Sequence, residues 1–169
     1  MANRLMRFLK HRSVDEADAK RLLGEGALER IQARVTASEL HHSGEIRVCI
    51  EAGLPTSYLR REANARERAV MMFGKLRVWD TEHNNGVLIY LLLAEHSIEI
   101  IADRGLARQV DAAEWQRVTG AMSAAFKSGQ FEAGLSQAVD AVDGLLAKHF
   151  ALAPGEVNPN ELPDAPFLR

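Results

Sequence analysis

Hydrophobic and polar residues alternate along residues 45–52, where Ile46, Val48 and Ile50 are separated by other side chains. A period of two predicts a β-strand with one fully buried face. Residues 87–94 differ, because they form an almost uninterrupted apolar run. A run of that length is short for a helix and typical of a strand buried on both faces, so we expect it at the centre of a sheet.

Two connections define how these strands are joined. Glu95, His96 and Ser97 form a tight link to a further strand at residues 98–102, which predicts a hairpin. Between the first strand and the central one, apolar residues recur at helical spacing over residues 59–76. This segment predicts a βαβ unit, whose crossover is right-handed in nearly all proteins.

Three further helices are expected. Ser13 and Glu16 have the spacing of a capping box, which predicts one helix over residues 13–40. Amphipathic stripes predict helices over residues 111–129 and 131–150 that cover the sheet. The predicted fold class is therefore α/β, with a mixed sheet that contains a right-handed βαβ unit and a hairpin and is sandwiched by helices.

The same pattern divides the chain into three parts. Residues 13–150 form the single α/β domain, which is the default for a chain of 169 residues. Residues 1–12 form a basic amphipathic segment before it. Residues 151–169 hold four of the five prolines and predict an extended tail that either wraps the domain or stays mobile.

The N-terminal segment is predicted to be a short helix in which most basic side chains oppose the apolar ones. Such a helix can lie weakly on an anionic lipid surface. It can equally pack on its own domain. The apolar residues are Met1, Leu5, Met6, Phe8 and Leu9, and the basic residues are Arg4, Arg7, Lys10, His11 and Arg12.

Composition narrows the class of protein without naming a reaction. Apolar residues make up 47% and charged residues 26% of the chain, as in ordinary globular proteins, and the net charge of −2 gives no argument for nucleic acid as a partner. The sequence shows no signal peptide and no membrane-spanning stretch, so we expect a cytoplasmic protein. Cys49 is the only cysteine and is expected to be a small buried hydrophobe.

Most signatures of catalysis are absent from the sequence, which has no GxxxxGK[ST] loop, no HExxH pair, no GxSxG elbow and no GxGxxG fingerprint. His41 and His42 suggest a metal, but adjacent side chains do not converge on one ion without a defined loop, so we expect solvated loop histidines. The arginines Arg60, Arg61, Arg66 and Arg68 are interleaved with glutamates, which predicts a solvated helical face rather than a phosphate site.

Oxygen-bearing side chains gather at the ends of strands and helices, where open α/β sheets tend to bind ligands. A hard cation such as Ca²⁺ or Mg²⁺ needs several oxygens from different segments. The best supply in the chain is Asp80, Glu82, Asn84, Asn85, Asp103, Asp111 and Glu114, and the metal ligands predicted from it are Asp80, Asn85, Asp103 and Asp111. The alternative is that these residues only form turns and caps, since Asn85 precedes Gly86 and Asp111 precedes a predicted helix.

Residues 43–150 resemble the TPM domain family, which occurs in plant thylakoid-lumen proteins and in bacterial membrane or envelope proteins. The resemblance is carried by SGEIRVCIEA, NNGVLIYLLL, SIEIIADRGL and FKSGQFEAGLSQAVDAV, in the family's order. It implies a sheet sandwiched by helices, and some members are reported as acid phosphatases or as binders of divalent cations. The chain looks like the short, stand-alone bacterial form.

In this family the loop before NGVL and the acids after the post-hairpin glycine supply the candidate metal site. Asn85 matches the first part, with Asp80 nearby. The second part is altered, because Ala107 stands two residues after Gly105 where the family has an acid. Asp103 is the substitute that this chain offers.

Two functions are compatible with these residues. The first is a non-catalytic accessory module that acts by contact with a protein partner, in the cytoplasm or held peripherally at the inner membrane by the N-terminal segment. The second is a divalent-metal-dependent phosphomonoesterase in which Asp80, Asn85 and Asp103 hold Ca²⁺ or Mg²⁺. In that enzyme Arg104 and Arg108 neutralise the phosphate.

Overall fold

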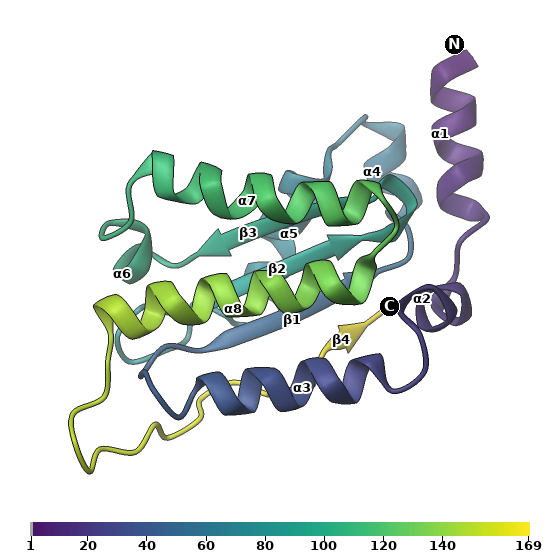
Figure 1. Cartoon of the computed structure of the whole chain (residues 1–169). Helices are drawn as coiled ribbons and strands as arrows, with labels where there is room; N and C mark the ends of the chain where they lie inside the picture. Colours follow the sequence, from purple (N-terminus) through teal and green to yellow (C-terminus); the bar gives the residue numbers. More distant parts are fainter. Residues whose placement is uncertain (1) are drawn as a thin grey trace.

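A four-stranded mixed sheet forms the centre of the chain, which the computed structural model describes over residues 2–169 (Figure 1). The strands are β1 (Ile46–Glu51), β2 (Val87–Leu92), β3 (Ser97–Ala102) and β4 (Phe167–Leu168). Their order is β3-β2-β1-β4, with β1 parallel to β2 and β4 and with β2 antiparallel to β3. The α/β fold class with a mixed sheet is confirmed.

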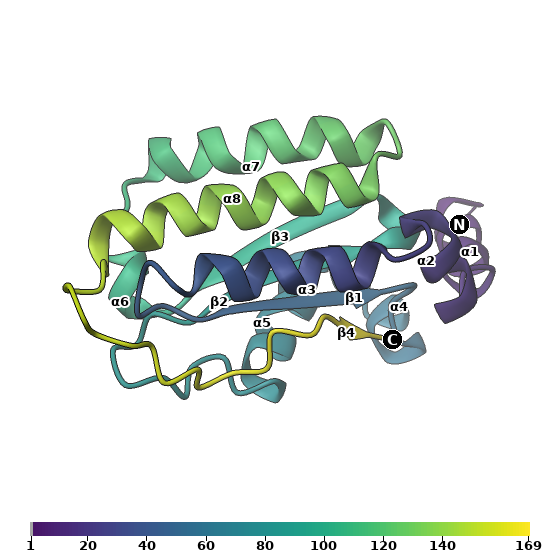
Figure 2. The ribbon, with the colours of Figure 1, turned by 60° about the horizontal axis from the view of Figure 1, so that its bottom comes forward.

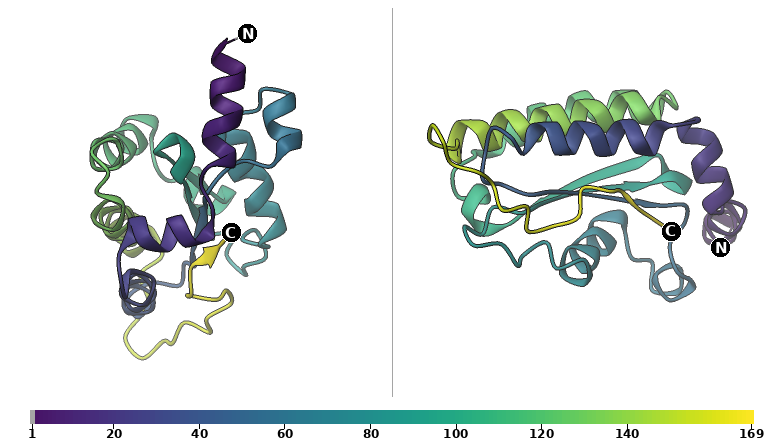
Figure 3. Two further views of the ribbon diagram at one scale, coloured as in Figure 1. Left: turned by 90° about the vertical axis from the view of Figure 1, so that its right-hand side faces the viewer. Right: turned by 90° about the horizontal axis from the view of Figure 1, so that it is seen from below.

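Helices cover both faces of the sheet. They are α1 (Ala2–Arg12), α2 (Glu16–Leu23), α3 (Ala27–Ser38), α4 (Thr56–Arg60), α5 (Ala65–Lys75), α6 (Arg104–Ala107), α7 (Ala112–Lys127) and α8 (Phe131–His149), with a 3₁₀ turn, η1, at Leu93–Glu95. Helices α3, α7 and α8 lie on one face (Figure 2), and α4 and α5 lie on the other (Figure 3). Each face has its own hydrophobic core, and both cores contain residues of β1 and β2.

The hairpin and the βαβ unit are both present as predicted. Val87 of β2 pairs with Ala102 of β3, and the two strands are joined through η1 and His96, whose φ is 49°. From β1 the chain passes behind the sheet through α4 and α5 and enters β2 above, which is the right-handed sense (Figure 1). Strand β2 is buried along its whole length, as expected of a central strand.

The helix predicted after Ser13 is in fact two helices, α2 and α3. Gly24 and Gly26 lie between them with φ angles of 99° and 68°, a backbone region that favours glycine and interrupts the helical hydrogen bonds. The capping box of α2 is formed by Asp15 and Asp18 rather than by the predicted pair. The Ser13 hydroxyl instead donates to a carbonyl of the preceding helix.

The helix predicted over residues 59–76 is also interrupted. Glu62 has a φ of 57°, and Asn64 and Glu67 then form a new capping box at the start of α5. The crossover of the βαβ unit therefore consists of two short helices, because a second strong helix start lies inside the apolar stripe.

Polar side chains of β1 are buried, although the alternation predicts only one buried face. Glu51 is 1% exposed and accepts hydrogen bonds from Arg68 Nε of α5 at 2.6 Å and from the Tyr90 hydroxyl at 2.8 Å. The predicted solvated face is wrong for Arg68, because its guanidinium is the counter-ion of Glu51. Cys49 is buried as expected, and burial raises the pKa of its thiol to about 12.

The proline-rich tail wraps the domain, which was one of its two predicted states, and ends as an edge strand. Its last strand, β4, pairs with the second half of β1. Arg47 donates to the backbone carbonyls of Pro163 and Ala165, and the Leu162 amide donates to Glu45 Oε2 at 3.0 Å. The tail thus covers the edge of β1 that the rest of the domain leaves free.

Two buried carboxyl groups, those of Glu39 and Glu45, lie beside this tail. Glu39 Oε1 accepts a hydrogen bond from the Ile46 amide at 3.0 Å, whereas its Oε2 is buried without a hydrogen-bond partner in the described chain. Burial raises the pKa of Glu39 to about 8, and the carboxylates of Glu45 and Asp164 add to the rise. Glu39 therefore stays protonated near neutral pH.

We expect Arg68→Met to destabilise the fold by about 3–5 kcal/mol, because it leaves the Glu51 carboxylate buried without its cation. The free energy of unfolding in urea measures the effect. Arg61→Met is the matched control, since Arg61 forms an exposed pair with Glu67 that contributes about 0–1 kcal/mol. Equal losses of unfolding free energy in the two variants would show that the buried pair contributes no more to stability than the exposed one.

We expect the pH dependence of stability to change in Glu39→Gln. The unfolded carboxyl ionises near its ordinary pKa of 4.5, whereas the folded one holds its proton to about pH 8, so stability falls as pH rises between these values. Glutamine keeps the acceptor for Ile46 and should gain about 1 kcal/mol or more over the wild type at pH 8 relative to pH 5, since tenfold in proton affinity is about 1.4 kcal/mol. Urea unfolding at both pH values measures this, with the exposed Glu29→Gln as control.

Candidate functional site

The loop before β2 carries the predicted Asn85 and is tied to the turn after β3. Asn84 has a φ of 52°, and the Asn85 amide donates to Thr81 Oγ1 at 3.1 Å. A side chain at Gly86 would lie 2.0 Å from a carbonyl oxygen of the preceding turn, so only glycine fits there. The Asp103 amide donates to the Gly86 carbonyl at 2.9 Å, which brings the two predicted segments together.

Asn85 is fully buried and holds the loop to the residues that precede β1. Its Nδ2 donates to the Ser43 carbonyl at 3.1 Å and is 3.3 Å from Ser43 Oγ. The carbonyl oxygen Oδ1 of the same side chain is buried and has no hydrogen-bond partner among residues 2–169. Buried acceptors without partners are rare in folded proteins, so this oxygen is a candidate ligand.

Asp103 caps α6 on the other side of Gly86. Its Oδ1 accepts from the Arg104 amide at 2.7 Å, and its Oδ2 is buried without a partner in the described part of the chain. Arg104 Nε donates to Asn84 Oδ1 at 3.0 Å, so this guanidinium fastens the loop. The structure therefore brings Asn85 and Asp103 to one end of the sheet, each with one unpartnered oxygen.

The other predicted ligands have local roles. Asp80 is half-exposed and forms an ion pair with Arg77 at 2.8 Å. Asp111 Oδ1 accepts from the Glu114 amide at 2.8 Å and caps α7, which is the cap alternative considered for it. Arg108 is exposed at the end of α6. Within residues 2–169 no three His, Cys, Asp or Glu side chains are grouped so that they could hold a metal ion.

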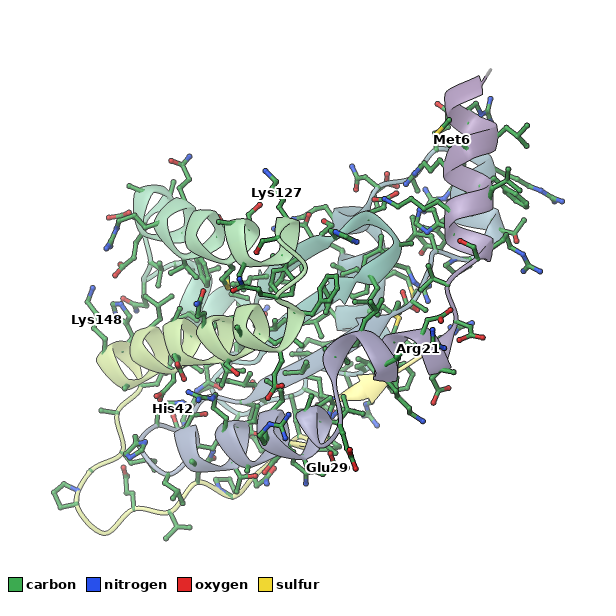
Figure 4. The ribbon with its side chains drawn as sticks, turned by 45° about the vertical axis from the view of Figure 1, so that its right-hand side comes forward. Met6, Arg21, Glu29, His42, Lys127 and Lys148 are labelled. Carbon is green, nitrogen blue, oxygen red and sulfur yellow. The ribbon has the colours of Figure 1, made fainter. Side chains whose placement is uncertain are left out.

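The expectation of solvated loop histidines is wrong for His42. His41 is exposed, but His42 is fully buried and lies between α3 and α8 (Figure 4). Its Nε2 is 3.4 Å from Asp143 Oδ1, and burial lowers the pKa of the imidazole. Burial of this position therefore disfavours the charged form of the imidazole.

The loops with Asn85 and Asp103 lie at the amino ends of the parallel strands β1 and β2. Ligands of open α/β sheets bind at the carboxyl ends of the strands. Asn85 and Asp103 therefore lie at the edge where this rule does not predict a ligand. At the carboxyl ends of this sheet the N-terminal helix is docked instead (Figure 3). A side chain at Gly53 would lie 2.5 Å from the His11 carbonyl, so glycine allows this close approach.

Helix α1 docks through its basic side chains. His11 Nδ1 accepts from the Leu54 amide at 3.0 Å, and the other ring nitrogen is 2.9 Å from Glu95 Oε1. Arg7 donates to Glu95 at 2.7 Å and to the Ala63 carbonyl at 2.8 Å. Hydrogen bonds from His11 and Arg7 lower the pKa of Glu95 in spite of its partial burial. Side chains of the docked helix therefore hold the Glu95 carboxylate of η1 from two positions, His11 and Arg7.

Three apolar side chains of α1 are exposed to solvent, whereas Phe8 packs against the core that contains residues of α4 and α5. Leu5, Met6 and Leu9 are 63%, 67% and 58% exposed, and we call these three side chains the outer stripe. The first turns of α1, where Met6 is labelled, project beyond the helices that cover the sheet (Figure 4). Of the two sequence-based alternatives for this helix, packing on its own domain is observed, whereas binding to a lipid surface stays a prediction. No helix within residues 2–169 is long and apolar enough to cross a bilayer.

Comparison with models of protein families matches residues 17–145 to the TPM domain. The chain belongs to the TPM domain family. The resemblance noted over residues 43–150 is confirmed, and the match extends it through α2 and α3. Helix α1 and the tail lie outside the matched residues of this TPM domain.

Two solved structures are similar to this TPM domain. The NMR structure of BA42 protein from the psychrophilic bacteria Bizionia argentinensis aligns with a TM-score of 0.75 and 27% identity, over 86% of this chain and 94% of that one. The NMR structure of the N-terminal domain of a protein from P. gingivalis aligns with a TM-score of 0.61 and 22% identity, over 79% of this chain and 83% of that one, and supports the fold alone. No curated protein matches the chain.

Proposed function

We propose that this TPM domain is a non-catalytic accessory module, which α1 holds peripherally on the anionic cytoplasmic surface of the inner membrane and which acts there by contact with a protein partner. The observation that carries the proposal is the orientation of α1. Its basic side is engaged with Glu95 and neighbouring groups, and the outer stripe is left exposed to solvent.

The outer stripe has the flanking charges that suit an anionic bilayer. At about 100° per residue, Lys10 and Arg12 fall on either side of Leu5, Met6 and Leu9, and both are exposed. A basic residue near such a surface adds about 1 kcal/mol to binding. A fully buried apolar side chain of this size adds about 1.5–3 kcal/mol. One short helix of this kind binds reversibly, as a peripheral contact requires.

One contact at the opposite edge of the sheet and one buried thiol inside β1 argue against turnover. Arg104, the predicted phosphate ligand, is fastened to Asn84, and the thiol of Cys49 is buried with a raised pKa. A buried thiol of that kind is a poor nucleophile, because the thiolate is the reactive form. Phosphate hydrolysis through Arg104 and Arg108 therefore stays a prediction without a contact in its favour.

We expect full-length protein to float with vesicles of phosphatidylglycerol and phosphatidylcholine at low salt. The double variant Met6→Ser/Leu9→Ser should weaken this partition about tenfold or more, because it removes two apolar side chains from the outer stripe. Val70→Ser is the matched control, since Val70 is an exposed apolar residue of α5 outside the stripe. A wild-type protein that ignores these vesicles would refute the membrane part of the proposal, as would a double variant that binds unchanged.

A divalent-cation site at Asn85 and Asp103 is the second candidate. It is favoured by the two buried oxygens without partners, Asn85 Oδ1 and Asp103 Oδ2, on segments joined by a backbone hydrogen bond. Carboxylate and amide oxygens are the ligands that Ca²⁺ and Mg²⁺ prefer. Such an ion would stabilise the loop before β2 without taking part in a reaction.

Ca²⁺ binding at this place predicts a higher melting temperature. At a concentration of about a hundred times Kd the gain is about 2.7 kcal/mol, which corresponds to several degrees for a chain of this size. Asp103→Asn should abolish the gain while asparagine still caps α6, and Asp80→Asn should leave it unchanged. Thermal unfolding with Ca²⁺, with Mg²⁺ and with chelator measures the effect, and equal shifts in both variants would place the ion elsewhere.

A further inference from the structure

A pocket of about 530 Å³ lies between α1 and α4. One part of its lining is apolar and consists of Leu5, Phe8 and Leu59. Leu5 belongs also to the outer stripe, so the pocket opens beside the surface that the proposed function assigns to the membrane. The pocket therefore combines an apolar wall with a place beside the outer stripe.

The remaining lining is dominated by guanidinium groups. Arg4, Arg7 and Arg60 lie around the pocket together with one acid, Glu62. Arg4 forms an ion pair with Glu62 at 2.7 Å and also donates to the Arg60 carbonyl at 3.0 Å. Arg7 forms its ion pair with Glu95. The pocket keeps an excess of positive charge after its own acid is counted.

Arg60 is the cation of the lining without an acid beside it. Its side chain is exposed and has no hydrogen-bond or ion-pair partner among the side chains that the structure describes, whereas Arg4 and Arg7 each have an acid beside them. A planar guanidinium forms two parallel hydrogen bonds with a phosphate, and this geometry gives Arg its preference for such groups.

We propose that this pocket binds the head group of a single anionic phospholipid. Arg60 binds the phosphate, with Arg4 beside it, and the wall of Leu5, Phe8 and Leu59 takes the glycerol and the first carbons of the chains. The proposal rests on the proposed membrane contact, because that contact delivers the lipid. A free phosphate ion fits less well, since it makes no use of the apolar wall.

The outer stripe and the pocket have different roles in this proposal. The stripe supplies attachment that depends on apolar area and on general charge, whereas the pocket selects one lipid molecule by its phosphate. Because Met6 and Leu9 do not line the pocket, their substitution removes attachment and leaves the pocket whole. The two proposals can therefore fail separately.

The test uses a soluble lipid, dihexanoyl phosphatidylglycerol below its micelle concentration, titrated into the full chain and followed by NMR shifts of the amides around the pocket. Arg60→Gln should weaken binding about tenfold, as expected for the loss of a charge-assisted contact, and Arg60→Lys should lose less. Arg61→Gln is the matched control, because Arg61 is bound to Glu67 and stacked on Tyr58 instead. Its affinity should stay within about twofold of the wild type.

Two further ligands identify the source of the phosphate. Dihexanoyl phosphatidylcholine should bind more weakly than the anionic lipid, and inorganic phosphate should bind more weakly still. Equal affinity for inorganic phosphate, or unchanged lipid binding in Arg60→Gln, would overturn the pocket proposal. Vesicle binding without binding of the short lipid would support the membrane contact and overturn the pocket proposal. Binding of the short lipid without vesicle binding would support the pocket and overturn the membrane contact.

Discussion

A carboxylate inside a sheet needs a cation beside it, because an unpaired charge in the interior costs several kcal/mol. Glu51 meets this need only when α5 brings Arg68 against the same face of β1, and the Tyr90 hydroxyl then occupies the remaining acceptor position. The ion pair thus fixes which face of β1 looks towards α5. A slip of one residue would put Ile50 against the guanidinium and Glu51 into the opposite apolar core.

Polar residues also hold the tail against the free edge of β1. Arg47 is on the same face of the strand as Glu51, but its guanidinium donates to backbone carbonyls of the tail and not to an acid. The tail can then pair β4 with the end of β1 and cover an edge that would otherwise offer free amides and carbonyls. Glu45, which precedes β1, holds the tail at a second place through Leu162. Polar residues in and beside β1 therefore position both α5 and the tail.

Periodicity was enough to predict the elements whose stability comes from apolar packing. The buried run of β2, the hairpin and the stripes of α7 and α8 all appear where the sequence places them. Periodicity failed where polar groups decide the structure. The alternation in β1 does not reveal that Glu51 will meet Arg68, because their contact depends on how α5 turns back after Glu62.

The candidate site was predictable to a similar degree. Asn85 and Asp103 are close in the chain's topology because one residue precedes the central strand and the other ends its hairpin partner, and both facts can be derived from the sequence. Asp80 and Asp111 could not be separated from them, since a cap and an ion pair on the surface use the same residue types as a ligand. Strand β4 was not predictable, because two residues after a proline carry no periodic signal.

The orientation of α1 shows how polar contacts can determine where apolar residues lie. The carbonyls of Arg60 and Ala63 lie at the end of α4 and in the loop after it, where backbone acceptors lack helical partners. Arginine side chains of α1 satisfy these acceptors, so the basic side turns inwards. The outer stripe is exposed as a consequence and not by its own preference. Because exposed apolar surface is unfavourable in water, a surface that covers the stripe stabilises the docked helix further if it binds the docked state better than the undocked one.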